Sequence, residues 1–495
     1  MFIRKLLTNN SYRVPLKHAS LGHQITRKNL FSSLGNKNKV FVATPIFYVN
    51  AAPHIGHVYS SVLADILTRF YALQENSVKL STGTDEHGLK VRHSSFLDNE
   101  ISKIPTSEPN TYEYISNETG SKVEWTQEEN YKFRLSKFND ILFQKIKSDE
   151  ILISPESRKN EILSWLKNGI QDISVSRPKS RLSWGIPVPN DDTQTIYVWI
   201  DALTNYLTVD GFYDPSYTSP NFFPPTYHIV GKDILKFHAV YWPALLLGAD
   251  LPLPRRIVAH GHWTIDDSKM SKSKGNVADP IAAINEFGVD AFRYFLARDG
   301  DIGFDNNYSE KNIQHRYNTE LVAHLGNFIS RCLSSKLGFN SALFANVVDQ
   351  ISKNGVQNQD LDLHNNLLEL PSIIEGLYKD ANFSKVLVSL NQTLSLANKH
   401  FSNNEPWNLT KNSDPSNPSD RLTTVGFYSL ETIRIVSILL SPIIPTKSSQ
   451  ILDTLNTPND QRSWKFSKFG SGWAKFLDSS SPLKQNISHI FPRKL

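Results

Sequence analysis

The sequence contains a single cysteine, Cys332, among its 495 residues. One thiol cannot form an intrachain disulfide, and it excludes every zinc site that needs two or more thiolates from this chain. Long apolar runs are also missing, because none approaches the roughly 18 consecutive apolar residues of a membrane span. With 39% hydrophobic and 20% charged residues, the composition is that of a globular chain of about two to four domains without a membrane partner.

Acidic residues are absent from the first 64 positions, and the first carboxylate is Asp65. Residues 1–39 hold eight Lys or Arg residues, several Ser and Thr, and short apolar clusters. This composition is typical of a mitochondrial transit peptide, whereas a secretory signal would need a continuous apolar core of about seven residues. We therefore predict a transit peptide over residues 1–39 and a location in the mitochondrial matrix. A basic tail without a targeting role is the alternative.

The positive net charge of +5 comes from this leader. The remaining chain has 45 basic and 48 acidic residues, a net charge near −3. The charge of the folded body therefore does not by itself indicate a nucleic-acid partner, and any contact with RNA must use local basic patches.

Strand and helix patterns alternate in the first part of the body. Short apolar runs at residues 40–44, 78–80, 195–199, 227–231 and 257–261 predict strands, and apolar residues four apart from Val58 to Phe70 predict a helix between the first two. This order is typical of an α/β fold with a doubly wound, Rossmann-like parallel sheet. We expect it to span residues 40–310, with an insertion at about 92–180 that contains a helix over residues 131–147.

Strand patterns disappear from about residue 311. Residues 367–377, 383–401 and 422–440 have the apolar periodicity of amphipathic helices, with turn-rich segments between them. Residues 311–495 are therefore predicted to form an all-α helical bundle.

A possible anion site follows the first predicted strand, at His54-Ile-Gly56-His57. A helix N-terminus offers unpaired N–H groups and a partial positive charge, and both histidines could donate hydrogen bonds to phosphate oxygens. Gly56 would allow a ligand to approach the backbone closely. Alone, the motif could equally be a helix cap with surface histidines.

A lysine-rich loop follows the last predicted strand, with the sequence Lys269-Met270-Ser271-Lys272-Ser273-Lys274-Gly275-Asn276. A solvated surface loop is the simplest interpretation of such a segment. The histidine motif at the other end of the same sheet, about 215 positions earlier, changes that interpretation. In this order and spacing, the two motifs resemble those of class I aminoacyl-tRNA synthetases.

Further segments resemble the methionyl-tRNA synthetases, most closely the mitochondrial and bacterial ones. They are residues 43–57 (ATPIFYVNAAPHIGH), 82–88 (TGTDEHG), 184–189 (WGIPVP), 197–202 (YVWIDA), 230–234 (VGKDI), 325–331 (LGNFISR) and 405–407 (EPW). The resemblance implies ATP-dependent charging of tRNA(Met) with methionine through a methionyl-adenylate, a ligase reaction that forms AMP and diphosphate.

The same resemblance implies the substrate sites. A thioether needs a roomy apolar and aromatic pocket, and the family's methionine-binding positions correspond here to Ile46, Tyr48, Asp85, Val198, Trp199, Ala202, Leu203, Tyr206, Ile234, His238 and Trp242. The catalytic positions correspond to His54, His57, Lys269 and Lys272, and the ATP-binding positions to His54, Gly56, His57, Gly231, Asp233 and Lys272. We expect Mg²⁺ to arrive with ATP and expect no zinc.

The resemblance also implies that the helical bundle binds the anticodon. Trp407 would stack on an unpaired base, and Asn327 and Arg331 would supply hydrogen bonds. No dimerising OB-type domain follows the predicted bundle, so we expect a monomer.

The chain departs from the family between residues 88 and 129, where it is shorter than usual. Because this connective insertion normally braces the tRNA acceptor stem, a non-catalytic synthetase-like tRNA-binding protein stays open as an alternative. Another class I synthetase is a second alternative. The isoleucine, valine and leucine enzymes need a large editing insertion, and the cysteine enzymes need a thiolate-bound zinc.

Overall fold

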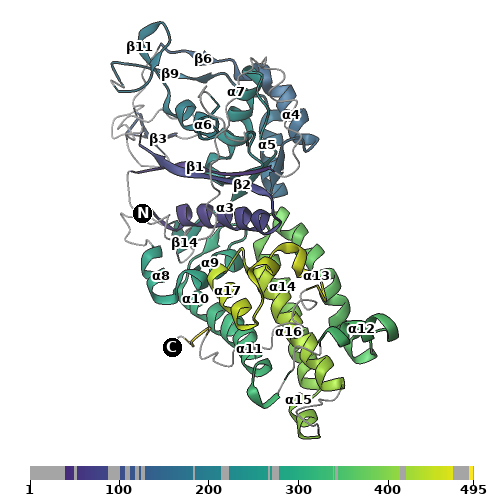
Figure 1. Cartoon of the computed structure of the whole chain (residues 1–495). Helices are drawn as coiled ribbons and strands as arrows, with labels where there is room; N and C mark the ends of the chain where they lie inside the picture. The colour runs from purple at the N-terminus through teal and green to yellow at the C-terminus, as the bar shows by residue number, and fades with distance from the viewer. Residues whose placement is uncertain are drawn as a thin grey trace.

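The computed structural model in Figure 1 describes residues 39–49, 53–86, 101–105, 112–116, 122–123, 129–181, 184–212, 222–265, 268–269, 278–337, 339, 344–412, 420–471 and 490–493. An α/β part and a helical part lie end to end, with the helix α3 (Ile55–Leu73) between them. The predicted fold class, a parallel-sheet core followed by a helical region, is confirmed.

The central sheet has five parallel strands in the order β2-β1-β12-β13-β7. Their bounds are β1 (Lys39–Tyr48), β2 (Ser77–Asp85), β7 (Leu152–Ser154), β12 (Tyr227–Gly231) and β13 (Arg256–His260). The chain order reverses between β1 and β12. In such sheets a crevice opens beyond the carboxyl ends of the two strands at this switch point, and ligands bind there.

Both faces of the sheet are covered, which is why its strands are rich in buried apolar residues. α3 and α9 (Val289–Asp299) pack on one face, in a core that continues into the helical part. α4 (Asn139–Lys147), α5 (Glu156–Lys167) and α7 (Trp242–Gly248) cover the other face, and α6 (Val198–Val209) packs against β1.

The strand expected at residues 195–199 does not belong to the central sheet. β11 (Asp191–Ile196) pairs antiparallel with β9 (Ser176–Pro178) and β10 (Pro187–Val188), and α6 begins at Val198. β7 takes the fifth place instead. The first half of β11 is largely exposed, as suits a small antiparallel sheet and not a parallel core strand.

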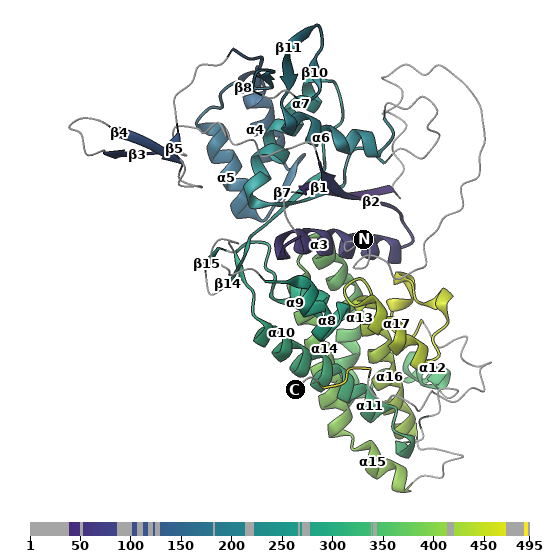
Figure 2. The same ribbon diagram turned by 90° about the vertical axis from the view of Figure 1, so that its left-hand side faces the viewer.

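The insertion contains more short strands than expected. The helix predicted over residues 131–147 begins only at Asn139, after β6 (Lys132–Phe133) and a 3₁₀ turn. β6 pairs with β8 (Ile173–Ser174). Earlier, β3 (Ile101–Pro105), β4 (Tyr112–Ser116) and β5 (Lys122–Val123) form an antiparallel sheet that projects from the body in Figure 2.

A small sheet and two helices connect the central sheet to the helical part. β14 (Trp263–Ile265) pairs with β15 (Ser268–Lys269) and with β16 (Asn306–Asn307). α8 (Pro280–Phe287) and α9 lie between β15 and β16 in the sequence. Asp279 caps α8 by accepting a hydrogen bond from the backbone N–H of Ile281.

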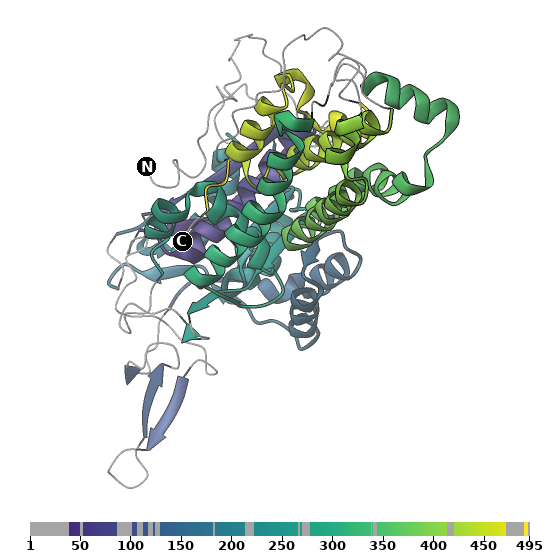
Figure 3. The ribbon, with the colours of Figure 1, turned by 90° about the horizontal axis from the view of Figure 1, so that it is seen from below.

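The helical part begins with α10 (Glu310–Arg316), a π-helix (Tyr317–Gly326) and α11 (Asn327–Cys332), which follow one another without a break. α12 (Phe344–Asn354), α13 (Leu361–Lys379), α14 (Phe383–Asn403), α15 (Pro406–Leu409), α16 (Asp420–Leu440) and α17 (Pro445–Thr454) follow. Figure 3 shows this bundle from below.

α16 is the central helix of the bundle. Among the described residues it is the one helix long and apolar enough to cross a membrane by length and composition, and that apolar stretch is entirely buried inside the protein. It also carries a fully buried ion pair, Glu431–Arg434, with an Nε–Oε2 distance of 2.7 Å. Both residues lie on α16, and they hold the segment around Phe466–Gly470 against it, because Arg434 also donates to the carbonyl oxygens of Phe466 and Lys468 and Glu431 accepts the backbone N–H of Gly470.

Candidate active site

The start of α3 forms a compact histidine cap. His54 is the N-cap, and its Nδ1 accepts the backbone N–H of Gly56 at 3.1 Å. His57 Nδ1 accepts the backbone N–H of His54 at 3.4 Å. The two rings stack with their centroids 3.8 Å apart. Gly56 fits beneath them because a Cβ there would come within 3.0 Å of the His54 ring.

These hydrogen bonds define which ring nitrogens carry protons. Burial, reinforced by neighbouring His54, lowers the pKa of His57 to about 4, so the His57 imidazole is neutral at pH 7. Its Nδ1 accepts a backbone N–H, and the proton of the neutral ring is therefore on Nε2. His57 thus provides a hydrogen-bond donor and not a positive charge, whereas the sequence suggested two donors whose charge state was open.

The second wall of the site follows β12, on the other side of the switch point. Asp233 Oδ1 lies 3.2 Å from His262 Nε2. A Cβ at Gly231 would come within 2.5 Å of that same Oδ1, so a larger residue there would displace the Asp233 carboxylate. Although partial burial opposes it, the hydrogen bond from His262 holds the pKa of Asp233 below its usual value.

His260 ends β13 and His262 follows it, and neither was singled out from the sequence. His260 is buried, and its Nε2 lies 2.7 Å from Ser60 Oγ on α3, which links α3 to the sheet. The backbone N–H of His262 donates to Asp305, which also accepts from Lys232 at 2.7 Å. The position of His262 directly after a predicted strand could have indicated this residue, whereas His260 lies within the strand.

The lysine loop is only partly described. Lys269 ends β15, which places its backbone beside β14 and downstream of β13. Lys272, which the resemblance places over the triphosphate, lies outside the described residues, as do residues 270–277. The roles of both lysines stay predictions.

An aromatic cluster fills the space between α6, β1 and α7. Tyr206 and Trp242 are buried with their rings 5.9 Å apart, and His238 packs 5.8 Å from Tyr206. Trp199 is half-buried beside Phe237 and Tyr241, at ring distances of 6.0 and 5.6 Å. The structure therefore brings together the four aromatic members expected on α6 and after β12.

A hydrogen-bond chain fixes the polar side of this cluster. His238 Nδ1 lies 3.0 Å from the carbonyl oxygen of Ile234, and its Nε2 lies 2.8 Å from the Tyr206 hydroxyl. Burial lowers the pKa of His238 to about 4. A carbonyl can only accept, so the neutral ring donates from Nδ1 and accepts the Tyr206 hydroxyl proton at Nε2.

Tyr48 and Asp85 meet at the carboxyl ends of β1 and β2, where they are paired in the strand register. Asp85 is only 5% exposed. Burial, together with the charge of Asp85, raises the pKa of Tyr48. A buried carboxylate at the carboxyl end of a sheet strand suits a ligand with an ammonium group, because a buried charge needs an opposite charge as its partner.

The remaining expected pocket residues come from the same elements. Ile46 is on β1, opposite Gly83 of β2, and Ile234 precedes a short π-helix (Phe237–Tyr241) that carries His238. α6 supplies the others, which are Val198, Ala202 and the buried Leu203.

His228 is a buried residue of this cluster that the sequence did not reveal. It lies on β12, with its ring 4.4 Å from Tyr206 and 5.3 Å from His238. Both of its ring nitrogens, and Nε1 of Trp242, lack a hydrogen-bond partner among the described residues. Burial lowers the pKa of His228 well below its usual value, so this wall of the cluster is polar but uncharged.

The residues expected to read the anticodon lie together at the far end of the helical part. Asn327 and Arg331 are four positions apart on α11, and the Arg331 guanidinium lies 4.7 Å from the centre of the Phe401 ring. Trp407, on α15, is 6.2 Å from the same ring and 42% exposed. Arg331 and Trp407 thus both pack on Phe401, and together with Asn327 they form what we call the anticodon-reading surface.

Metal ligands do not cluster in the part of the chain that is described. No group of three or more His, Cys, Asp or Glu side chains there could hold a metal ion. The expectation that the protein uses no zinc stays a prediction.

Comparisons with known proteins agree with this arrangement. A family model described as "tRNA synthetases class I (M)" matches residues 40–104 and 104–333. The match is divided at residue 104, inside the segment 88–129 that we expect to be shorter than in the family.

Curated relatives match over most of the chain. Methionine–tRNA ligase, mitochondrial, from Bos taurus is 36% identical, over 86% of this chain and 85% of its own length. Methionine–tRNA ligase from Rickettsia conorii is also 36% identical, over 86% of this chain and 95% of its own length.

A solved structure shows the same fold. Mycobacterium tuberculosis methionyl-tRNA synthetase in complex with methionyl-adenylate superposes with a TM-score of 0.77 and 31% identity, covering 92% of this chain and all of that one. The sequence motifs, the histidine cap at the sheet's switch point and these relatives lead to one assignment. The chain belongs to the methionyl-tRNA synthetases of class I.

Proposed function

We propose that this protein is a methionine–tRNA ligase that activates L-methionine with ATP and charges tRNA(Met). The observation that carries the proposal is the His54–His57 cap, which faces the turn after β12 across the switch point of the sheet. A structural relative with this fold is described as a complex with methionyl-adenylate, the intermediate that such a site would form.

ATP would bind across this switch point. His54, Gly56 and His57 would hold the phosphates with ring and backbone N–H groups at the N-terminus of α3. Gly231 and Asp233 would hold the adenosine, because Asp233 offers carboxylate oxygens that can accept ribose hydroxyls. Mg²⁺ would arrive bound to the phosphates and supply further charge neutralisation there.

Activation needs no general base, because the methionine carboxylate is already ionised at neutral pH. One carboxylate oxygen bonds to the α-phosphorus, the bond to the bridging oxygen of the β-phosphate breaks, and pyrophosphate leaves. Positioning and stabilisation of developing negative charge are therefore the main requirements. Neutral His57 donates a hydrogen bond, and we assign the positive charge to Lys269 and Lys272.

Methionine would lie in the aromatic cluster with its ammonium group at Asp85. The thioether suits the polarizable rings of Trp199, Tyr206 and Trp242. The uncharged hydrogen-bond chain from Ile234 through His238 to Tyr206 would give this pocket polarity without a competing charge.

In the second step, a terminal hydroxyl of the tRNA attacks the carbonyl carbon of the adenylate and AMP leaves. Asn327, Arg331 and Trp407 would select the tRNA, with Trp407 stacking on a splayed anticodon base. We assign residues 40–310 to catalysis and 311–495 to tRNA binding.

The mitochondrial relatives and the acid-free leader together support action in the mitochondrial matrix after removal of residues 1–39. We propose that the mature enzyme is a monomer that uses ATP with Mg²⁺ and no zinc.

The test is amino-acid-dependent exchange of labelled pyrophosphate into ATP, measured with each of the twenty amino acids. We expect methionine alone to support rapid exchange and the same preparation to charge tRNA(Met). Exchange with another amino acid would contradict the substrate assignment. Binding of tRNA(Met) without any exchange would instead support a non-catalytic tRNA-binding protein.

A further inference from the structure

A row of residues four apart runs along the continuous helix formed by α10, the π-helix and α11. Its members are Lys311, His315, Thr319, Ala323, Asn327 and Arg331, all exposed or half-buried. An α turn holds about 3.6 residues, and a π turn holds more because its hydrogen bonds span five positions. Steps of four therefore drift in opposite directions in the two kinds of turn, which keeps the row on one side of the helix.

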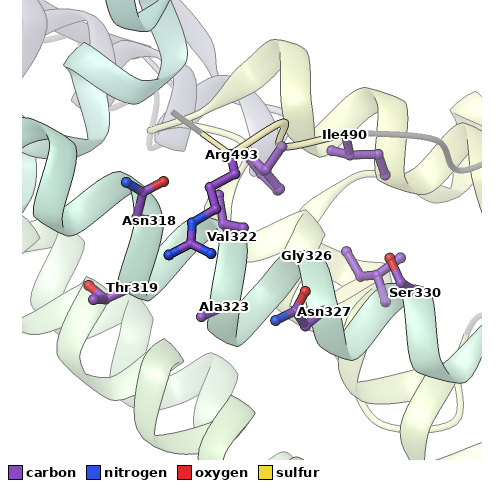
Figure 4. A pocket seen from close by; sticks show the side chains of 11 residues that line it. Asn318, Thr319, Val322, Ala323, Gly326, Asn327, Ser330, Ile490 and Arg493 are labelled. Atoms are coloured by element: carbon purple, nitrogen blue, oxygen red, sulfur yellow. The ribbon is translucent and has the colours of Figure 1, made fainter. Parts of the chain in front are cut away.

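The middle of this row borders a groove of about 690 Å³. The segment Ile490–Arg493 forms its other bank, as Figure 4 shows, with the Arg493 guanidinium directed toward Asn318, Thr319 and Ala323. Asn327 and Ser330 continue the groove along the helix toward the anticodon-reading surface.

Arg493 is held in place by its neighbours in the sequence. The Tyr317 hydroxyl donates to the carbonyl oxygen of Pro492 at 2.8 Å. Phe491 is buried, packs 6.4 Å from the Tyr317 ring, and lies close enough to Gly326 that a Cβ there would be in contact with it at 3.5 Å. The backbone that carries the cation is therefore fixed against the π-helix.

The groove has the chemistry of an anion site and lacks that of a base-stacking site. Of the described residues, eleven line it, and these include one cation and no carboxylate. The Asn327 amide and the Ser330 hydroxyl also line the groove and can donate hydrogen bonds to an anion, whereas the Thr319 hydroxyl already donates to the carbonyl oxygen of His315. Its one aromatic ring, Phe491, is buried, so no exposed ring is available to stack on a base. A sugar–phosphate backbone fits this combination better than a nucleobase does.

We propose that this groove binds the sugar–phosphate backbone of the tRNA anticodon arm, with Arg493 as its main phosphate ligand. The inference rests on the proposed function. From Thr319 to Arg331 the row covers roughly 18 Å of helix, enough for several consecutive phosphates. Asn327 and Arg331 would read the loop, and the groove would hold the strand that leads from the loop toward the catalytic part.

The first test replaces Arg493 with glutamine in the full-length protein. We expect a roughly tenfold weaker Kd for an RNA of the tRNA(Met) anticodon-arm sequence, the loss expected for one charge-assisted contact. The slope of log Kd against log salt should fall by about one. Lys353→Gln, at an exposed lysine on α12 away from the groove, is the matched control and should bind the arm normally.

A second test places a charge in the groove without removing a contact. Ala323 is exposed on the helix, so both Ala323→Glu and the uncharged, similarly sized Ala323→Gln should fold. We expect the glutamate variant to raise KM for tRNA(Met) about tenfold through repulsion of phosphate, and the glutamine variant to raise it far less.

The outcomes separate this inference from the proposed function. Normal anticodon-arm binding by Arg493→Gln, or equal effects of the two Ala323 substitutions, would overturn the phosphate groove while the unaltered protein still activates methionine. An equal loss of affinity for an acceptor-stem RNA would also overturn it, because the groove would then not be specific to the anticodon arm. Absence of methionine-dependent exchange in the unaltered protein would contradict the function itself.

Discussion

The candidate active site and the core of the helical part hold different polar groups. The candidate active site holds histidines whose pKa values are lowered by burial, namely His57, His228, His238 and His260. The core of the helical part holds ion pairs. Arg434 pairs with Glu431, and Arg421 Nη1 lies 2.8 Å from Asp360 Oδ2. His400 also contacts Asp360, at 2.6 Å.

The difference reflects what each part must leave available. An ion pair uses its partners' hydrogen-bonding capacity within the protein and fixes helices relative to one another. A neutral imidazole in a fixed tautomer can donate to or accept from a substrate without a fixed charge nearby. In the aromatic cluster, His228 and Trp242 keep buried polar atoms without partners among the described residues. The candidate pocket therefore keeps unpartnered ring nitrogens, whereas the unpartnered atoms in the described helical part include hydroxyls such as those of Ser437 and Thr457.

The largest effect should come from breaking the buried pair in the scaffold. Glu431→Gln leaves the Arg434 charge uncompensated inside α16 and should lower the free energy of unfolding by about 3–5 kcal/mol. Urea denaturation followed by far-UV circular dichroism measures this. The double variant Glu431→Leu with Arg434→Met should recover most of the loss. An unchanged stability of Glu431→Gln would mean that the pair contributes little to the bundle.

The next largest effect should come from the catalytic charge. Lys272→Ala should lower the rate of methionine-dependent pyrophosphate exchange by about 10²-fold or more, the loss seen when one preorganised donor to a transition-state anion is removed. Because Lys272 is expected in a loop and not in the core, the urea midpoint of unfolding should not move. Lys274→Ala in the same loop is the control, and an equal loss there would indicate a diffuse charge effect.

A smaller effect is expected at the anticodon surface. Trp407→Ala removes a half-exposed stacking platform and should raise KM for tRNA(Met) by about tenfold, because base stacking on an aromatic side chain contributes ~1–3 kcal/mol. Pyrophosphate exchange needs no tRNA, so Trp407→Ala should leave its rate unchanged if the catalytic part acts independently of the helical part. Trp407→Phe should restore most of the affinity, and a null effect of both variants would remove Trp407 from the proposed reader.

The smallest effect for a single step should appear on mild acidification, from pH 7 to pH 6. Folded His238 and His260 have pKa values of about 4, whereas the unfolded chain protonates near 6.5. The unfolded state therefore binds more protons between these values, and stability falls as the pH drops from 6.5 toward 4, by at most about 1.4 kcal/mol per group and pH unit. Asp360, whose pKa is held down by His400 and Arg421 although burial opposes this, should keep its pairing through that window.

Melts at pH 7, 6 and 5 followed by tryptophan fluorescence and by far-UV circular dichroism would test this difference. We expect the fluorescence transition, which reports on the catalytic part, to shift to lower temperature on acidification before the far-UV circular dichroism transition of the helices does. Coincident loss of both signals would show that the parts respond to acid as one unit.

Much of the fold followed from local pattern. β12 was predicted over residues 227–231 and lies there, because a buried parallel strand is a short apolar run without interruption. β11 was assigned to the wrong sheet, since a short strand carries no information about its partner. The π-helix was also not foreseen, because an apolar spacing of three to four residues is compatible with α and π turns.

The site was predicted mainly through motifs, and this limited what could be found. His54 and His57 lie in a recognisable motif and stack on each other, and Tyr206 and His238, which the resemblance placed in the methionine pocket, share a hydrogen bond. Their roles stay predictions. His228 and His260 lie inside strand sequences, where a histidine looks like any other core residue. Only the three-dimensional arrangement shows that each contacts another histidine or a residue of α3.

The buried contact between Asp65 and Arg293 affects how the protein could bind the acceptor end and the anticodon of one tRNA at the same time. Arg293, on α9, is fully buried, lies 2.7 Å from Asp65 of α3 and donates to the carbonyl oxygen of Ile443, just before α17. Arg293 thereby connects α3, which begins with the histidine cap, to the helical bundle. The distance between the proposed active site and the proposed anticodon-binding residues is then fixed by the fold. A substitution at Arg293 could therefore lower the rate of tRNA charging while every residue that contacts a substrate is unchanged.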